Sequence, residues 1–238
     1  MITKLKHLWQ QAFGADGMDA FFRTAFDENR WWAITQNGQL ISALYWLDYT
    51  WRGEKFAYIY AVATDEQFRR QGYGEKLMAQ AHKALQAQGY AGAILVPAEA
   101  HLVRWYEKQG YETFYRAKKQ MVLPGKNIGV QEISAAQYAA LRQERMPNIP
   151  QPGKEVYRYF ATYGKFYQAE DCLFAAALQG DTAYFQEFLG ENQKLPGVIS
   201  ALGAKKGIAT LPDAETTFAM CNRFGDCPLP DYFSFALD

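Results

Sequence analysis

The sequence of 238 residues has no formal net charge, only three cysteines and no long apolar run, and each of these absences excludes a class of protein. Proteins that bind nucleic acid are usually basic overall, whereas here 25 Lys and Arg residues balance 25 Asp and Glu residues. No stretch approaches the roughly 20 apolar residues that cross a bilayer, and residues 1–9 lack the apolar core of a signal peptide. We therefore expect a cytoplasmic protein with no nucleic-acid partner and no membrane partner.

The three cysteines, Cys172, Cys221 and Cys227, are too few and too odd in number for a disulfide framework. The pair Cys221 and Cys227 has no histidine close by, so its spacing is poor for zinc. We expect buried thiols in a reducing compartment and no bound metal.

The length corresponds to one large domain or two small ones. A stretch with Pro and Gly at 123–127 is the boundary that the sequence favours. Residues 1–125 carry 15 basic and 12 acidic side chains, net +3, whereas residues 126–238 carry 10 and 13, net −3. The zero net charge is therefore the sum of a small positive charge on the first range and a small negative charge on the second. We expect two domains over these ranges.

Residues 1–125 switch repeatedly between helical and strand periodicity. Apolar residues at three- and four-residue spacing predict helices, and alternating or β-branched runs predict strands. Asn37-Gly38 between two such runs is a strong signal for a two-residue hairpin turn. The expected order is ααβββαβαβ, a mixed α/β class with parallel pairing in its later part. The helices are expected at 3–13, 18–26, 72–88 and 99–108, and the strands at 31–36, 39–51, 56–63, 91–96 and 111–122.

The strongest chemical signal follows the strand at 56–63, where Arg69-Arg70-Gln71-Gly72-Tyr73-Gly74 leads directly into a helix. Two glycines let a ligand approach the backbone, and the free N–H groups at a helix start attract phosphate-like anions. The alternative is a turn that binds no ligand, in which the glycines only relieve backbone strain and the two arginines are solvated. A dinucleotide fingerprint is excluded because position 77 is Leu, and a Walker loop because Gly74 is followed by Glu75.

This motif resembles the signature of the GNAT superfamily of N-acetyltransferases, Gln/Arg-x-x-Gly-x-Gly/Ala after the fourth strand of that fold. A second family feature, Tyr-Glu-Lys-x-Gly-Phe/Tyr, is matched downstream by Tyr106-Glu107-Lys108-Gln109-Gly110-Tyr111. The order and spacing of the two motifs fit as well, and the resemblance covers about residues 3–122. It implies a GNAT fold, a mixed central sheet flanked by helices.

The resemblance implies acetyl-CoA as cosubstrate, held between the fourth and fifth strands of the fold. Main-chain groups at Ala61, Val62 and Ala63 would pair with the pantetheine arm. Amides of Arg70, Gln71, Gly72, Tyr73 and Gly74 would hold the pyrophosphate, with Arg69 adding charge. Tyr106 matches the tyrosine that often protonates the departing CoA thiolate. Alternatively, Tyr106 has only a structural role, as an aromatic core residue on an amphipathic helix.

The implied reaction is direct attack of a primary amine, on a small molecule or a peptide, on the thioester. Some family members carry a glutamate as base on the fourth strand, but residues 56–63 contain no acid. Glu54 and Asp48 are the nearest substitutes, although a solvated strand end is the better interpretation of each. A second departure is Glu99, where many relatives have asparagine. A non-catalytic acyl-CoA sensor or interaction module therefore stays open as the rival hypothesis.

Residues 126–238 have a strand-rich order similar to a partial, degenerate GNAT repeat. The expected elements are a helix at 134–145, strands at 165–178 and 182–189, a helix at 194–203, and strands at 206–211, 217–223 and 231–237. The phosphate signature is missing, because the corresponding turn at 189–194 has one glycine and an added acid. We expect this half to bind no CoA and to complete the acceptor cleft or an oligomer interface, which leaves a homodimer open.

Overall fold

The computed structural model describes residues 1–237 and gives the first half the expected order of elements. Each predicted helix and strand of residues 1–125 is present, with ends shifted by at most a few residues. The elements are α1 (Ile2–Phe13), α2 (Met18–Thr24), β1 (Trp31–Gln36), β2 (Gln39–Trp51), β3 (Glu54–Thr64), α3 (Tyr73–Ala87), β4 (Gly92–Leu95), α4 (Leu102–Glu107) and β5 (Glu112–Val122).

Local sequence explains these elements. Helix α1 buries Leu5, Leu8 and Trp9, which lie on one face at helical spacing. At the β1–β2 turn Asn37 and Gly38 have φ angles of 49° and 76°, the left-handed pair that a two-residue hairpin needs. The predicted hairpin is therefore confirmed together with its turn residues.

The described part of the second half also alternates between strands and α-helices. They are β6 (Gln131–Ile133), α5 (Ala135–Arg145), β7 (Gln151–Pro152), α6 (Lys154–Phe160), β8 (Lys165–Gln168), β9 (Leu173–Gln179), β10 (Thr182–Leu189), α7 (Leu195–Ala201) and β11 (Lys206–Arg223). Two expectations were wrong here: the strand at 165–178 is two strands, and the strands at 206–211 and 217–223 are one. Helix α6 was not predicted.

The second half repeats the architecture of the first. Helices α5 and α6, the strands β8, β9 and β10, helix α7 and strand β11 correspond in order to α1, α2, β1, β2, β3, α3 and β4. The pairing repeats too: three antiparallel strands are followed by a parallel partner, β4 beside β3 and β11 beside β10. This repetition supports a degenerate second copy of the same fold.

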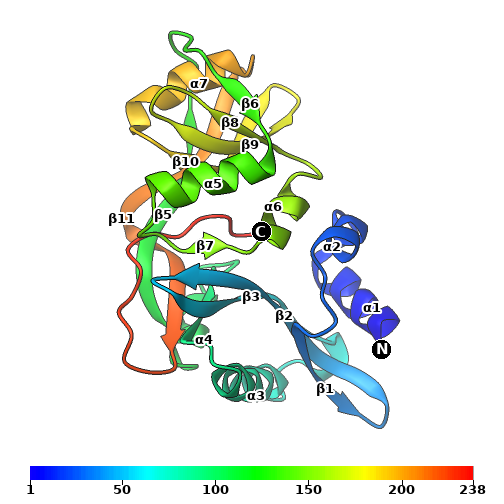
Figure 1. Cartoon of the computed structure of the whole chain (residues 1–238). Coiled ribbons are helices and arrows are strands. Elements are labelled where there is room, and N and C mark those ends of the chain that lie inside the picture. Colours follow the sequence, from blue (N-terminus) through cyan, green and yellow to red (C-terminus); the bar gives the residue numbers. More distant parts are fainter. Residues whose placement is uncertain (238) are drawn as a thin grey trace.

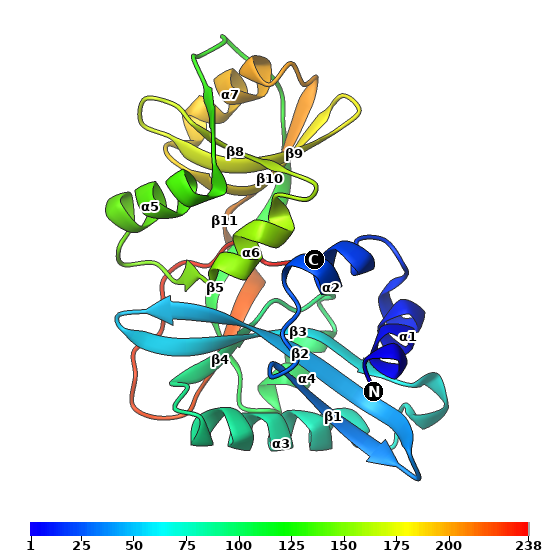
Figure 2. The same cartoon turned by 45° about the vertical axis from the view of Figure 1, so that its right-hand side comes forward.

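One long strand joins the two halves into a single sheet. Strand β11 pairs with β10 at its beginning and with β4 at its end, and β5 lies along its other edge. Figures 1 and 2 show β11 running from the upper half of the molecule into the lower half. The expected boundary near residue 125 lies in the loop between β5 and β6. The first half nevertheless depends on a strand from the second half to complete its sheet.

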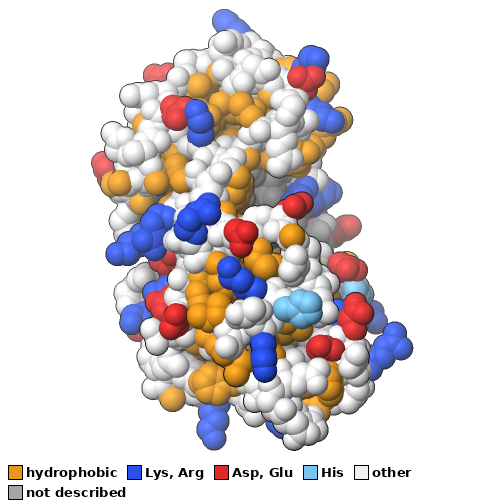
Figure 3. Space-filling model, turned by 90° about the vertical axis from the view of Figure 1, so that its right-hand side faces the viewer, with side chains coloured by type: hydrophobic (Ala, Val, Ile, Leu, Met, Phe, Trp, Pro, Cys, Tyr) orange, Lys and Arg blue, Asp and Glu red, His pale blue; other side chains and the backbone are white. Residues whose placement is uncertain are grey.

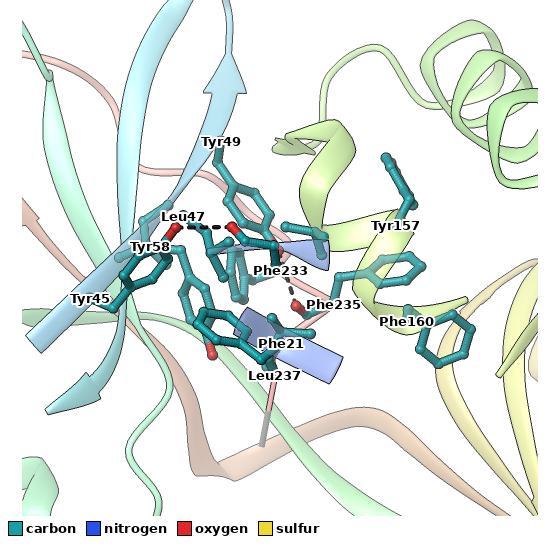
Figure 4. Close-up of a cluster of buried hydrophobic side chains, with 14 of the residues drawn as sticks. Phe21, Tyr45, Leu47, Tyr49, Tyr58, Tyr157, Phe160, Phe233, Phe235 and Leu237 are labelled. Atoms are coloured by element: carbon teal, nitrogen blue, oxygen red, sulfur yellow. Dashed lines mark hydrogen bonds between the residues drawn. The ribbon is translucent and has the colours of Figure 1, made fainter. Parts of the chain in front are cut away.

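The segment 231–237 is not a strand, which corrects the expectation. Phe235 has a φ of 56°, which interrupts an extended backbone, and Pro230 precedes the segment. The segment runs between the two halves (Figure 1), and Phe233 and Phe235 are buried to 2% and 0% exposure. Figure 4 shows these two rings among aromatic side chains of both halves, with Tyr49 and Tyr58 on one side and Tyr157 and Phe160 on the other.

Two separate clusters of buried side chains cover the two faces of the first-half sheet. One contains Tyr45, Tyr49 and Tyr58 and continues into the second half, and the other lies under α3 and contains Trp46 and Tyr106. On the side that carries α1 and α2, exposed apolar side chains gather on both halves (Figure 3).

The three thiols are free, and Cys172 and Cys221 are buried as expected. Cys227 is only partly buried, which corrects the expectation for that residue. Of the helices in residues 1–237, none is long and apolar enough to cross a membrane.

Candidate active site

Strands β3 and β4 run parallel for only three residue pairs and then separate. The last pair joins Tyr58 to Ile94, whereas β3 continues to Thr64. Beyond Tyr58, no strand within residues 1–237 pairs with this edge of β3, although β2 pairs with its other edge. An unpaired edge offers its N–H and C=O groups to an extended ligand. The separation therefore leaves a free edge on β3, between the two strands where the resemblance implies the cosubstrate.

A β-bulge lies within this free edge. Tyr45 of β2 pairs with Tyr60 and Ala43 with Ala63, so β3 has one residue more than β2 between these pairs. Ala61 takes up the irregularity with a φ of 53°, a left-handed angle that is uncommon for alanine. Such bulges turn the backbone groups of a strand away from its ladder. The predicted residues Ala61, Val62 and Ala63 thus form the part of β3 with the least regular pairing.

After β3 the chain makes a turn whose amides point into open space. Arg70 and Gly72 both have left-handed backbones, with φ angles of 61° and 79°. Gly72 is the N-cap of α3, and Lys76 is the first residue whose N–H bonds back, to the Gly72 carbonyl at 3.1 Å. Within residues 1–237, no backbone carbonyl accepts from the N–H groups of 70–75. A Cβ built on Gly72 meets nothing within 4 Å, so the turn has room for a ligand.

Positive charge lies at the same turn. Arg70 is exposed, and Arg69 is held over the end of β3 by a bond from its Nε to the Thr64 carbonyl at 3.1 Å. Helix α3 is fifteen residues long, so its start also carries the partial positive charge of the helix dipole. A diphosphate satisfies both the free amides and the guanidinium groups.

Gly74 and Trp105 fix the start of α3 against α4. A Cβ on Gly74 would come within 3.2 Å of the Trp105 ring, so a larger residue would push the two helices apart. The Trp105 Nε1 donates to the Glu75 carboxylate at 2.7 Å. This bond holds Glu75, the acidic residue in the first turn of α3. A small residue at position 74 therefore suits the packing of α3 on α4, a reason that the sequence alone could not distinguish from ligand approach.

Tyr106 lies beneath the point where the strands separate. It belongs to the same buried cluster as Ile59, the first β3 residue beyond the last pair, and Leu95, the last residue of β4. Its side chain is 8% exposed, and burial raises the pKa of its phenol to about 12. No hydrogen bond within residues 1–237 uses its hydroxyl. Among the described residues, Tyr106 is therefore a neutral donor without a hydrogen-bond partner.

The C-terminal segment occupies part of the corresponding place in the second half. Strands β10 and β11 also pair in parallel, from Thr182 to Phe185, and β10 has a bulge immediately afterwards. The C-terminal segment enters there, and Gln186 donates to the carbonyl of Ala236. A space of about 10 Å³ remains beside Gln186 and Phe233, and a second cavity of about 290 Å³ is lined by Gln186, Ile208 and Ala236. Pro196 in the first turn of α7 also removes an amide that a phosphate would need.

None of the acids considered as a base lies at the bulge. Asp48 is occupied by an ion pair with Arg30 at 2.9 Å and a hydrogen bond from Tyr90 at 2.6 Å. Glu54 is exposed at the start of β3, roughly 23 Å before Ala61 at the rise of an extended strand. Glu99, the departure from asparagine and not a candidate base, is exposed and paired with His101. Glu54 is the exposed residue at a strand end that the sequence predicted, whereas Asp48 is ion-paired within β2 and is not a solvated strand end.

Comparison with known proteins identifies the fold built around this opening. A family model described as an acetyltransferase (GNAT) domain matches residues 1–114. The first half of the chain is a GNAT acetyltransferase domain. No curated protein matched the sequence.

Solved structures extend the similarity over both halves. A GCN5-related N-acetyltransferase from Anabaena variabilis has a TM-score of 0.71 at 15% identity, covering 92% of this chain and 69% of that one. One from Kribbella flavida has a TM-score of 0.67 at 16% identity, with 92% and 68% covered. A tandem GNAT protein from the clavulanic acid biosynthesis pathway has a TM-score of 0.56 at 11% identity, with 95% and 96% covered. At these identities the likeness shows the fold alone.

Two residues outside the two sequence motifs support the candidate site from elsewhere in the chain. Asn222 of β11 contacts the end of α4, and His82 of α3 bonds to Tyr111. No local pattern identifies either residue, because their partners lie 113 and 29 positions away. Only the pairing of β11 with β4 brings Asn222 to this place.

Proposed function

We propose that the protein is an acetyl-CoA-dependent N-acetyltransferase with one cofactor site, between β3 and β4. The observation that carries the proposal is the coincidence of three features at one opening. These are the free edge of β3 with its bulge at Ala61, the open amides of the turn before α3, and the unpartnered phenol of Tyr106. Bound there, acetyl-CoA supplies an activated thioester.

The chain's own residues then have separate tasks. The edge at Ala61–Ala63 aligns the pantetheine arm as an added strand, and the amides of 70–74 with Arg69 and Arg70 hold the diphosphate. Tyr106 donates its phenolic proton to the thiolate that leaves when the amine attacks the thioester carbon. Because burial raises the pKa of Tyr106 to about 12, the phenol keeps this proton at neutral pH.

The acceptor is a primary amine of a small molecule or a peptide, which attacks as the free base in a ternary complex. No side-chain acid lies on β3 between Phe56 and Ala63. Proton removal therefore falls to solvent at the open edge, and an amine with a lowered pKa is favoured as acceptor.

The missing acid also supports a second candidate function, a non-catalytic acyl-CoA sensor. The experiment that separates the two measures release of free CoA thiol from acetyl-CoA against a panel of small amines and peptides with free amino groups. The enzyme releases CoA in proportion to acetylated amine. Tight binding of acetyl-CoA without release for any amine would favour the sensor, and no binding would reject both.

A further inference from the structure

Asn222 of β11 brings a polar side chain from the second half of the chain to the end of α4, close to Tyr106. Its Nδ2 donates to the backbone carbonyl of Gln109, immediately after α4, at 2.8 Å. The adjacent Gly110 has a φ of 87°, and a Cβ on it would come within 3.0 Å of the same Nδ2. The glycine in the motif after Tyr106 is therefore needed both for its backbone angle and to admit Asn222.

The same amide nitrogen connects to a buried imidazole. Asn222 Nδ2 lies 3.4 Å from Nδ1 of His82, and Nε2 of His82 lies 2.8 Å from the Tyr111 hydroxyl. Burial lowers the pKa of His82 to about 4, so its ring is neutral. With Nδ1 accepting from the amide, the ring proton sits on Nε2 and is donated to Tyr111. The arrangement satisfies both hydrogens of the Asn222 amide nitrogen.

Tyr111 and Gln109 in turn hold Tyr106. Their backbone N–H groups both donate to the Tyr106 carbonyl, at 3.2 and 2.8 Å. The Tyr111 ring packs edge-on against the Tyr106 ring with centroids 5.7 Å apart. Helix α4 has only six residues and no side-chain cap at its start, so it cannot fix a side chain without tertiary support.

We propose that Asn222 is a positioning residue, which through Gln109, His82 and Tyr111 sets the place of the Tyr106 hydroxyl beneath the opening. The second half thereby contributes to catalysis in the first. This inference rests on the proposed function, because it assigns Asn222 a role through the acid Tyr106. Small displacements of a reacting group have large kinetic effects, so the expected cost is kinetic as well as structural.

The test is a double-mutant cycle on acetyl transfer to the best amine of the panel, followed by CoA thiol release. Asn222→Ala is expected to lower kcat about ten-fold and to leave the KM for acetyl-CoA within about two-fold. In a Tyr106→Phe background the same change is expected to have almost no further effect on kcat, because the group being positioned is gone. Arg223→Gln is the matched control, since Arg223 also ties β11 to the first half, through Glu112 at 2.6 Å, and does not contact α4.

Asn222→Asp keeps the size of the side chain and exchanges the amide donors for acceptors, so it tests the hydrogen bonds separately from the packing, and thermal unfolding checks that each variant is folded. It is expected to lower kcat as Asn222→Ala does. Equal losses of kcat in the wild-type and Tyr106→Phe backgrounds would overturn the positioning role, as would a change in KM alone or full activity of both Asn222 variants. If Tyr106→Phe itself keeps full turnover, the acid assignment under the proposed function fails instead, and the cycle shows this separately.

Discussion

The Tyr49 hydroxyl donates a hydrogen bond of 3.0 Å to the backbone carbonyl of Phe235, which lies 186 residues later in the chain. Tyr49 belongs to β2 of the first half, whereas Phe235 also packs on Tyr157 and Phe160 of the second half. The C-terminal segment therefore acts as shared core between the two copies of the fold. If this segment left its place, apolar surface on both halves would become exposed.

Phe235→Ala is expected to lower the free energy of unfolding by about 3–5 kcal/mol, because it leaves a cavity at a fully buried ring. The matched control is Phe13→Ala, because Phe13 is 57% exposed and its loss is expected to cost about 0.5 kcal/mol or less. Urea denaturation followed by tryptophan fluorescence measures both. Similar small losses for the two variants would show that the C-terminal segment does not join the halves.

Gly72→Ala is expected to weaken acetyl-CoA binding by at least about ten-fold, because the added methyl group enters the space over the turn and strains its left-handed backbone. Gly89→Ala is a matched control: Gly89 has a φ of 81°, an equally open Cβ position, and lies at the far end of α3. Both variants should lose about 1 kcal/mol of stability. Isothermal calorimetry with acetyl-CoA distinguishes them, and equal affinities would remove the turn from the binding site.

Arg142→Met is expected to destabilise the protein by about 3–5 kcal/mol, because it leaves the buried Glu187 carboxylate without its cation. The two side chains are 1% and 0% exposed and 2.9 Å apart, and Ser234 of the C-terminal segment also donates to Glu187. Lys165→Met breaks an exposed pair with Glu132 and should cost less than about 1 kcal/mol. Thermal unfolding at neutral pH compares the two, and a small loss for Arg142→Met would contradict the expectation that the buried Glu187 carboxylate needs its cation.

Stability is expected to fall as the pH drops from 6.5 towards 4, partly because of His82. Burial lowers its pKa from 6.5 to about 4 in the folded state, so below pH 6.5 the unfolded chain takes up the proton first. Above pH 6.5 the protonation of His82 costs the folded state almost nothing. Near pH 4 it lowers the free energy of unfolding by up to about 3 kcal/mol. His82→Gln should therefore lose less stability over this range than the wild type. The exposed His7→Gln should follow the wild type, and identical curves for all three would contradict the burial of His82.

The sequence predicted the first half well because its signals are local. Helical spacing, the Asn37-Gly38 turn and the Arg69–Gly74 motif each depend on residues that are neighbours in the chain. The second half was harder, because β11 is specified by partners in three other strands, and Phe235 by contacts with both halves. Asn222 could not be recognised as part of the site before its strand was placed beside β4.

The most direct measurement is a crystal structure with acetyl-CoA bound. We expect one molecule of acetyl-CoA per chain. Its diphosphate should lie on the amides of 70–74, its pantetheine arm along Ala61–Ala63, and its sulfur within hydrogen-bond reach of the Tyr106 hydroxyl. Density for the cosubstrate between β10 and β11, or anywhere away from the opening between β3 and β4, would contradict it.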